Sequence, residues 1–167
     1  MDEKQYDVEA VKTRLYEYRD IAKEIDSQSE RLERLKAKMY GVGAQAITDM
    51  PRTPSPDFDR MAGLIQQKEE LEKEIEESIE RQRSEREYLE GIVKHLRRAE
   101  ERTVIRVRYF DCASWNDVVD LMFGDRPDLL EKEDGYLRRV YKLHGQALYG
   151  MAKYIEENDP NRSGTVG

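Results

Sequence analysis

A seven-residue repeat between residues 56 and 98 constrains the fold of this chain more than any other feature of its sequence. Two series of positions carry the repeat: Leu64, Leu71, Ser78, Glu85 and Ile92, and Lys68, Ile75, Gln82, Leu89 and Leu96. A sustained heptad is typical of a coiled-coil helix, which here would extend about 60 Å. The repeat is polar in its middle, which indicates a weaker seam or a change of packing partner there.

A second amphipathic helix is predicted over residues 7–39. Its stripe steps by three and four residues through Val11, Leu15, Tyr18, Ala22, Ile25, Ser29 and Leu32, and then Leu35 and Met39. Gly41 and Gly43 predict its end. Residues 41–55 hold several prolines and are predicted to be a linker, after which Ser55 can cap a helix that starts at Pro56. We therefore expect residues 1–40 and 56–98 to form a long antiparallel helical hairpin, a coiled coil.

The composition favours an all-α protein. Of the 167 residues, 39% are charged and 38% hydrophobic, and the formal net charge is −7, which suits long solvated helices. No apolar run approaches the roughly 18 residues of a membrane span, and the acidic start MDEKQYD predicts no secretory signal. The single cysteine, Cys112, argues against an internal disulfide or a cysteine-based zinc site. We expect a cytoplasmic protein.

Residues 99–156 have the layout of a helix-turn-helix domain. A helix is predicted over Glu100–Phe110, and Ser114 with Asp117 forms a capping box that opens a helix ending at Gly124. A third helix begins near Asp134 or Gly135, and its apolar positions are Leu137, Val140, Leu143 or His144, Ala147, Leu148 and Met151. A short helix, a turn and a longer helix with a basic outer face are typical of DNA-binding modules. The polar residues 157–167 predict a disordered tail.

Two strings in this domain resemble a known family. VIRVRYFDCASWNDVVDLMFG resembles the first two helices of the region-four module of bacterial sigma factors, and RRVYKLHGQAL, residues 138–148, is similar to its recognition helix. The closer similarity is to phage and prophage proteins related to the ArpU and RinA regulators of late transcription, which share a coiled coil and a linker like Asp49-Met50-Pro51 to Ser55-Pro56. The resemblance covers residues 40–155. The turn at 124–133 departs from it, because the usual turn has about three or four residues.

The charge is divided unevenly along the chain. Residues 66–90 hold five basic and ten acidic residues, a net charge of −5, whereas residues 94–108 have a net charge of +4 and residues 134–154 one of +3. Phosphate binding depends on the local potential within about 10 Å rather than on the total charge. The acidic total therefore does not argue against DNA as a partner.

The predicted site lies on the third helix and its surroundings. Arginine and glutamine have the forked geometry that reads guanine and adenine edges. The predicted DNA contacts are Arg138, Arg139, Lys142, Gln146, Tyr136, Tyr141 and His144, and the candidate phosphate contacts are Arg97, Arg98, Arg102, Trp115 and Asn116. The alternative is an ordinary solvated face, with Trp115 as a core anchor and His144 as a packed residue.

The sequence predicts no enzyme, because catalytic, metal-binding and cofactor-binding patterns are all missing from it. The two histidines, His95 and His144, lack the spacing of a metal site. The expected function is a phage or prophage DNA-binding transcriptional regulator in the cytoplasm of a bacterial host. Its expected partners are double-stranded DNA and a second copy bound through the coiled coil, with host RNA polymerase as a further candidate and no membrane. The alternatives are a small-terminase-like DNA-packaging subunit and a structural coiled-coil adaptor.

Overall fold

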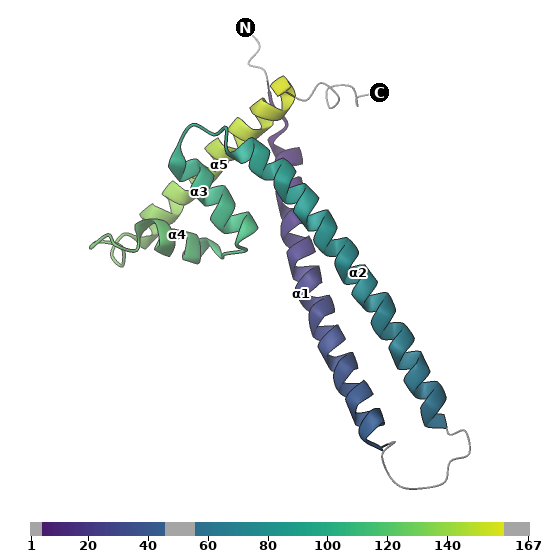
Figure 1. Cartoon of the computed structure of the whole chain (residues 1–167). Helices are drawn as coiled ribbons and strands as arrows, with labels where there is room; N and C mark the ends of the chain where they lie inside the picture. Colours follow the sequence, from purple (N-terminus) through teal and green to yellow (C-terminus); the bar gives the residue numbers. More distant parts are fainter. Residues whose placement is uncertain (1–4, 46–55, 159–167) are drawn as a thin grey trace. The chain divides into compact units, whose positions relative to one another are not determined.

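The computed structural model describes residues 5–45 and 56–158, and every regular element within these ranges is helical (Figure 1). In chain order the elements are α1 (Val8–Gln45), α2 (Pro56–Val93), α3 (Ala99–Ile105), the π-helical turn η1 (Arg106–Phe110), α4 (Trp115–Phe123) and α5 (Glu133–Asn158). The predicted all-α fold, a helical hairpin followed by a helical domain, is confirmed. Residues 46–55 of the predicted linker and 159–167 of the predicted tail lie outside the described residues.

Contacts divide the chain into two units. One, which we call the core unit, combines the start of α1 up to Arg19 with everything from Ser84 onward, and the other, the hairpin unit, is Asp20–Arg83. Both α1 and α2 therefore contribute to each unit. This division differs from the predicted domain 99–156, because that range leaves out the ends of α1 and α2 that pack in the core unit.

Three helix ends differ from their predicted positions. Helix α1 continues through Gly41 to Gln45, because a helical glycine costs only about 1 kcal/mol relative to alanine and the next residue, Val42, is buried. Helix α2 ends at Val93 rather than at 98, since the chain turns where the Leu96 N–H donates to the Val93 carbonyl at 3.0 Å. Helix α5 runs to Asn158, so residues 157 and 158 of the predicted tail are helical.

In the hairpin unit, α1 and α2 run antiparallel, and an exposed ion pair joins Arg81 to Glu24 at 3.5 Å. The repeat positions Leu71, Ile75 and Ser78 of α2 are buried, as the heptad predicts. On α1, however, Ser29 is exposed and Gln28 is half-buried in its place. The reason is the register: Gln28 continues a heptad with Leu35 and Val42, whereas Ser29 lies on the outer side.

The core unit contains a large hydrophobic cluster contributed by α1, α2, the α3–η1 segment and α5. Its buried members are Val11, Leu15, Tyr18, Leu89, Ile92, Val93, Leu96, Ile105, Tyr109, Phe110, Ala147, Leu148, Met151, Ala152 and Ile155. The polar middle of the α2 repeat is explained at Glu85, whose carboxylate accepts from Arg14 Nη2 at 3.0 Å across the helix pair. Arg14 also lies over the Tyr88 ring, with 3.8 Å between Cζ and the ring centroid.

A second cluster joins α3, α4 and the first half of α5. It consists of Val104, Val118, Val119, Phe123, Val140 and Leu143. Helix α4 begins as predicted, because Ser114 Oγ accepts from the Asp117 N–H at 3.2 Å. The second hydrogen bond of a capping box would run from the Ser114 N–H to the Asp117 carboxylate. It does not occur among the described residues, because aspartate is one methylene shorter than the usual glutamate.

The connection between α4 and α5 is tied by hydrogen bonds despite its length. The Tyr136 hydroxyl donates to Asp128 Oδ1 at 2.6 Å, and Lys132 Nζ lies 3.4 Å from Asp128 Oδ2. The bond from Tyr136 lowers the pKa of the Asp128 carboxyl below its ordinary value. Leu129 packs against the second cluster, whereas Leu130 is fully exposed. The expanded turn is therefore anchored to the first turn of α5 by its polar groups and one leucine.

Candidate nucleic-acid interface

Helix α5 presents an uninterrupted basic face. The exposed residues Arg138, Lys142, Gln146 and Lys153 fall on one side of the helix, opposite the buried stripe that includes Val140 and His144. No acidic residue occurs between Gly135 and Ile155 in the sequence. This face therefore combines cations with an amide in the way that reading of a major groove requires.

The basic face borders a groove of about 880 Å³. The second wall is the connection between α2 and α3, where Arg97 and Arg98 are exposed. The lining residues are His95, Leu96, Arg97, Arg98, Glu101, Lys142, Gly145, Gln146, Tyr149, Gly150, Lys153, Tyr154 and Glu157. Four of them are cations and two are carboxylates, so the groove has a positive balance. It thereby brings together Arg97–Arg98 and Lys142, which lie far apart in the sequence.

The close approach of α5 to the α2–α3 connection depends on a glycine. A Cβ at Gly150 would lie 2.8 Å from Leu96 Cδ2, whereas a Cβ at Gly145 would meet nothing within 4 Å. We expect Gly145→Ala to raise the free energy of unfolding by about 1 kcal/mol, and Gly150→Ala to gain little because Leu96 must shift. Urea unfolding of both variants checks this, and an equal gain at the two positions would contradict the close approach.

Three of the predicted DNA contacts are exposed on the surface: Arg138, Lys142 and Gln146. Arg138 is exposed and has no ion-pair partner among the described residues, and Lys142 lines the groove together with Gln146. Arg139 is turned toward α3: its Nη2 lies 3.7 Å from Glu100 Oε1, and its Cζ lies 5.0 Å from the centroid of the Phe123 ring. Arg139 must therefore give up or share these contacts to reach DNA.

The predicted aromatic contacts lie at the edge of the basic face. Tyr136 packs its ring on Phe123, with 5.0 Å between centroids, and its hydroxyl is bound to Asp128. Tyr141 is 45% exposed and meets the Trp115 ring edge-on at 5.0 Å. Both rings therefore support the helix from its flank, and Tyr141 retains a surface that a ligand can touch.

His144 is buried and does not belong to the exposed face of α5, so its prediction as a DNA contact is corrected. It is 8% exposed, and its Nε2 lies 2.7 Å from the Tyr109 hydroxyl. Burial, together with the positive charges of Lys12 and Arg108, lowers the pKa of His144 to about 4. The imidazole is therefore a neutral core group at ordinary pH, which agrees with the alternative of a packed residue.

The candidate phosphate contacts fall into two groups. Arg97 and Arg98 are exposed at the groove, and Asn116 is exposed in the first turn of α4, outside the lining of the groove. Arg102 instead donates to the Leu96 carbonyl and closes the α2–α3 connection. Trp115 is half-buried, its ring meets His144 edge-on at 4.9 Å, and Arg108 Cζ lies 4.4 Å from its centroid. Arg102 and Trp115 thus have structural contacts in the fold.

The turn before α4 is held by arginines that sequence reasoning missed. Cys112 has a φ of 58°, a left-handed conformation that non-glycine residues seldom adopt. Arg19 Nη2 donates to the Cys112 carbonyl at 3.1 Å, and Arg108 Nη1 donates to the Ala113 carbonyl at 2.9 Å. The first helix of the chain therefore fixes the turn that positions α4. The sequence carries no local signal for this contact, because Arg19 looks like any cation on a solvated face.

Lys153 is the other residue that was missed as a site residue. It lines the groove two helical turns beyond Gln146. Its spacing of eleven residues from Lys142 is a signal that the sequence did contain, since residues separated by eleven share a helix face.

A family model matches the middle of the chain. Residues 57–127 match a family model described as "Protein of unknown function (DUF1492)", a family that is commonly phage-associated. No curated protein and no solved structure matches this chain. Within the described ranges, no group of three or more acidic, histidine or cysteine side chains could hold a metal ion. None of the helices there is long and apolar enough to cross a bilayer.

Proposed function

We propose that this chain is a DNA-binding transcriptional regulator of phage or prophage origin that reads its site with α5. The observation that carries the proposal is the acid-free basic face of α5, with Arg138, Lys142 and Gln146 exposed together. Helices α4 and α5 share one apolar cluster, which is the packing that lets a recognition helix enter the major groove. The resemblance to sigma region four and the phage-associated family model support the same assignment.

The two walls of the groove would have different roles in DNA binding. Side chains on the exposed face of α5 would contact base edges, while Arg97 and Arg98 on the opposite wall would contact phosphates. Such a regulator acts where the DNA is, in the cytoplasm of a bacterial host. Contact with host RNA polymerase is part of the same proposal and rests on the resemblance alone.

We expect the double variant Arg138→Ala/Lys142→Ala to bind its DNA site roughly 10- to 100-fold more weakly than the natural chain. Genome-wide footprint sequencing identifies the sites, and fluorescence anisotropy on the most enriched fragment measures the affinity. The matched control is Lys23→Ala/Arg60→Ala, which removes two exposed cations of the hairpin unit. If the natural chain shows no enrichment over the Arg138/Lys142 variant, recognition by α5 is wrong.

The same assay distinguishes sequence-specific base contacts from nonspecific phosphate contacts. Arg97→Ala/Arg98→Ala should weaken binding to all sequences alike and reduce the dependence of log K on log salt by about two. Sites upstream of late genes support a regulator. Sites at a packaging start, together with a ring-shaped oligomer, would support the small-terminase-like alternative instead, and absence of DNA binding would leave the structural adaptor.

A further inference from the structure

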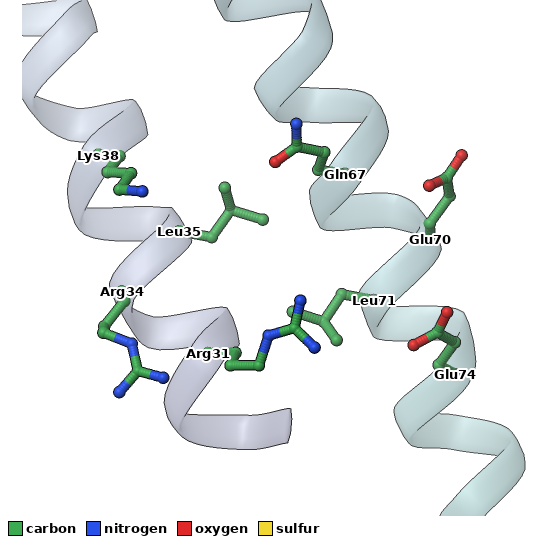
Figure 2. A pocket seen from close by; sticks show the side chains of 8 residues that line it. All are labelled: Arg31, Arg34, Leu35, Lys38, Gln67, Glu70, Leu71 and Glu74. Carbon is green, nitrogen blue, oxygen red and sulfur yellow. The ribbon is translucent and has the colours of Figure 1, made fainter. Parts of the chain in front are cut away.

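The hairpin unit contains a groove between its two helices. Its volume is about 370 Å³, and its lining is Arg31, Arg34, Leu35 and Lys38 from α1 with Gln67, Glu70, Leu71 and Glu74 from α2. Figure 2 shows Leu35 and Leu71 pointing into the space between the helices, with Glu70 and Glu74 on the far side of α2. The two leucines give the groove its apolar part, and the Arg31 side chain extends from α1 into the same space.

The two edges of this groove have opposite charge. We call Arg31, Arg34 and Lys38 the basic wall and Glu70 and Glu74 the acidic wall; all five side chains are exposed. No ion pair between the two walls occurs among the described residues. Both walls lie at the same level of the antiparallel helices, because they line one groove.

The apolar seam of α1 is also incompletely covered in this unit. Ile25, Leu32 and Leu35 are only half-buried in the single chain, whereas Leu15 and Tyr18 of the same helix are fully buried in the core unit. Half-buried heptad positions on a helix pair are the usual contact face of a larger bundle. A partner that supplies both apolar surface and charge would therefore complete this face.

We propose that the hairpin groove is the contact face between two copies of this chain, paired about a two-fold axis parallel to the helices. This axis places α1 of each copy beside α2 of the other, antiparallel, and preserves the level along the helices. The basic wall of each copy then meets the acidic wall of the second copy, and the contact occurs twice. The two walls are thus self-complementary, which is the property that an isologous interface requires.

A partner with a different sequence would have to carry a wall of each sign in the matching arrangement, whereas a second copy carries both by symmetry. The presence of both signs at one level in a single chain therefore favours a second copy. This pairing is independent of the proposed DNA binding, because it uses the hairpin unit only and is measured without DNA.

The test is a charge exchange measured by sedimentation equilibrium on the full chain. The first variant, Arg31→Glu/Arg34→Glu, makes both walls acidic, and the second, Glu70→Lys/Glu74→Lys, makes both basic. We expect the natural chain to dimerise, and each variant alone to dimerise roughly 10- to 100-fold more weakly. A mixture of the two variants should form a heterodimer, because each variant then meets the opposite charge on its partner. The dimer of the natural chain should weaken at about 0.5 M salt.

Controls keep the result interpretable. Circular dichroism checks that each variant is helical, and Arg60→Glu/Lys73→Glu reverses two α2 cations outside the groove lining as a matched change. A monomeric natural chain overturns the proposal, and so does a natural dimer that neither variant weakens. Failure of the two variants to associate with each other, when both are folded, overturns it as well.

Discussion

Lowering the pH from 6.5 to 4 is expected to remove about 3 kcal/mol from the free energy of unfolding of the core unit through His144 alone. In the folded chain the pKa of His144 is lowered from 6.5 to about 4, chiefly by burial and then by the charges of Lys12 and Arg108. Between these two pH values the unfolded chain binds a proton that the folded chain does not. The free energy of unfolding is therefore not reduced by His144 well above pH 6.5, and it falls steadily as the pH drops toward 4.

Tryptophan fluorescence in urea, followed from pH 7 to pH 4.5, measures this effect. Trp115 is the single tryptophan, and its ring lies 4.9 Å from that of His144, so it reports on the core unit. His144→Gln removes the titrating group while keeping a polar partner for the Tyr109 hydroxyl, and should flatten the slope. An identical slope in the natural chain and His144→Gln would disprove the role of His144.

Periodicity was sufficient to predict most of the helices. The two long helices, the Ser114 cap and the buried stripe of α5 all follow from spacing within one segment, because helix geometry repeats locally. The predicted end of a helix was wrong where a local stop signal competed with the packing of a buried side chain. Gly41 is a good stop signal, yet α1 continues past it to bury Val42.

The candidate site was harder to predict because it depends on contacts between distant segments. Arg138, Lys142 and Gln146 could be placed on one exposed face from the helical repeat. The helical repeat puts His144 at the border of the buried stripe, and its burial is decided by contacts with Tyr109 and with the first helix of the chain. The turn that Arg19 holds illustrates the same limit, since a contact across more than ninety residues leaves no pattern in the sequence.

Truncating Leu15 to alanine is expected to destabilise the core unit by about 3 kcal/mol, as large-to-small substitutions in a closed core do. Leu15 is 0% exposed and packs in the cluster that joins α1, α2, the α3–η1 segment and α5. The same substitution at Leu32, half-buried on the same helix in the hairpin unit, should shift the Trp115 unfolding transition by no more than about 1 kcal/mol. Urea unfolding monitored by Trp115 fluorescence compares the two.

The comparison decides whether the start of α1 belongs to the same folding unit as α5, the proposed recognition helix. A large effect at Leu15 with a small one at Leu32 means that the proposed recognition helix is stabilised by residues 5–19, although the sequence places them at the far end of the chain. Equal effects at the two positions would mean that α1 unfolds as a single element and that the two units are not separate in energy. Since Arg19 also holds the turn before α4, we expect the first result. We expect the Leu15 variant to weaken the proposed DNA binding only through loss of the folded state.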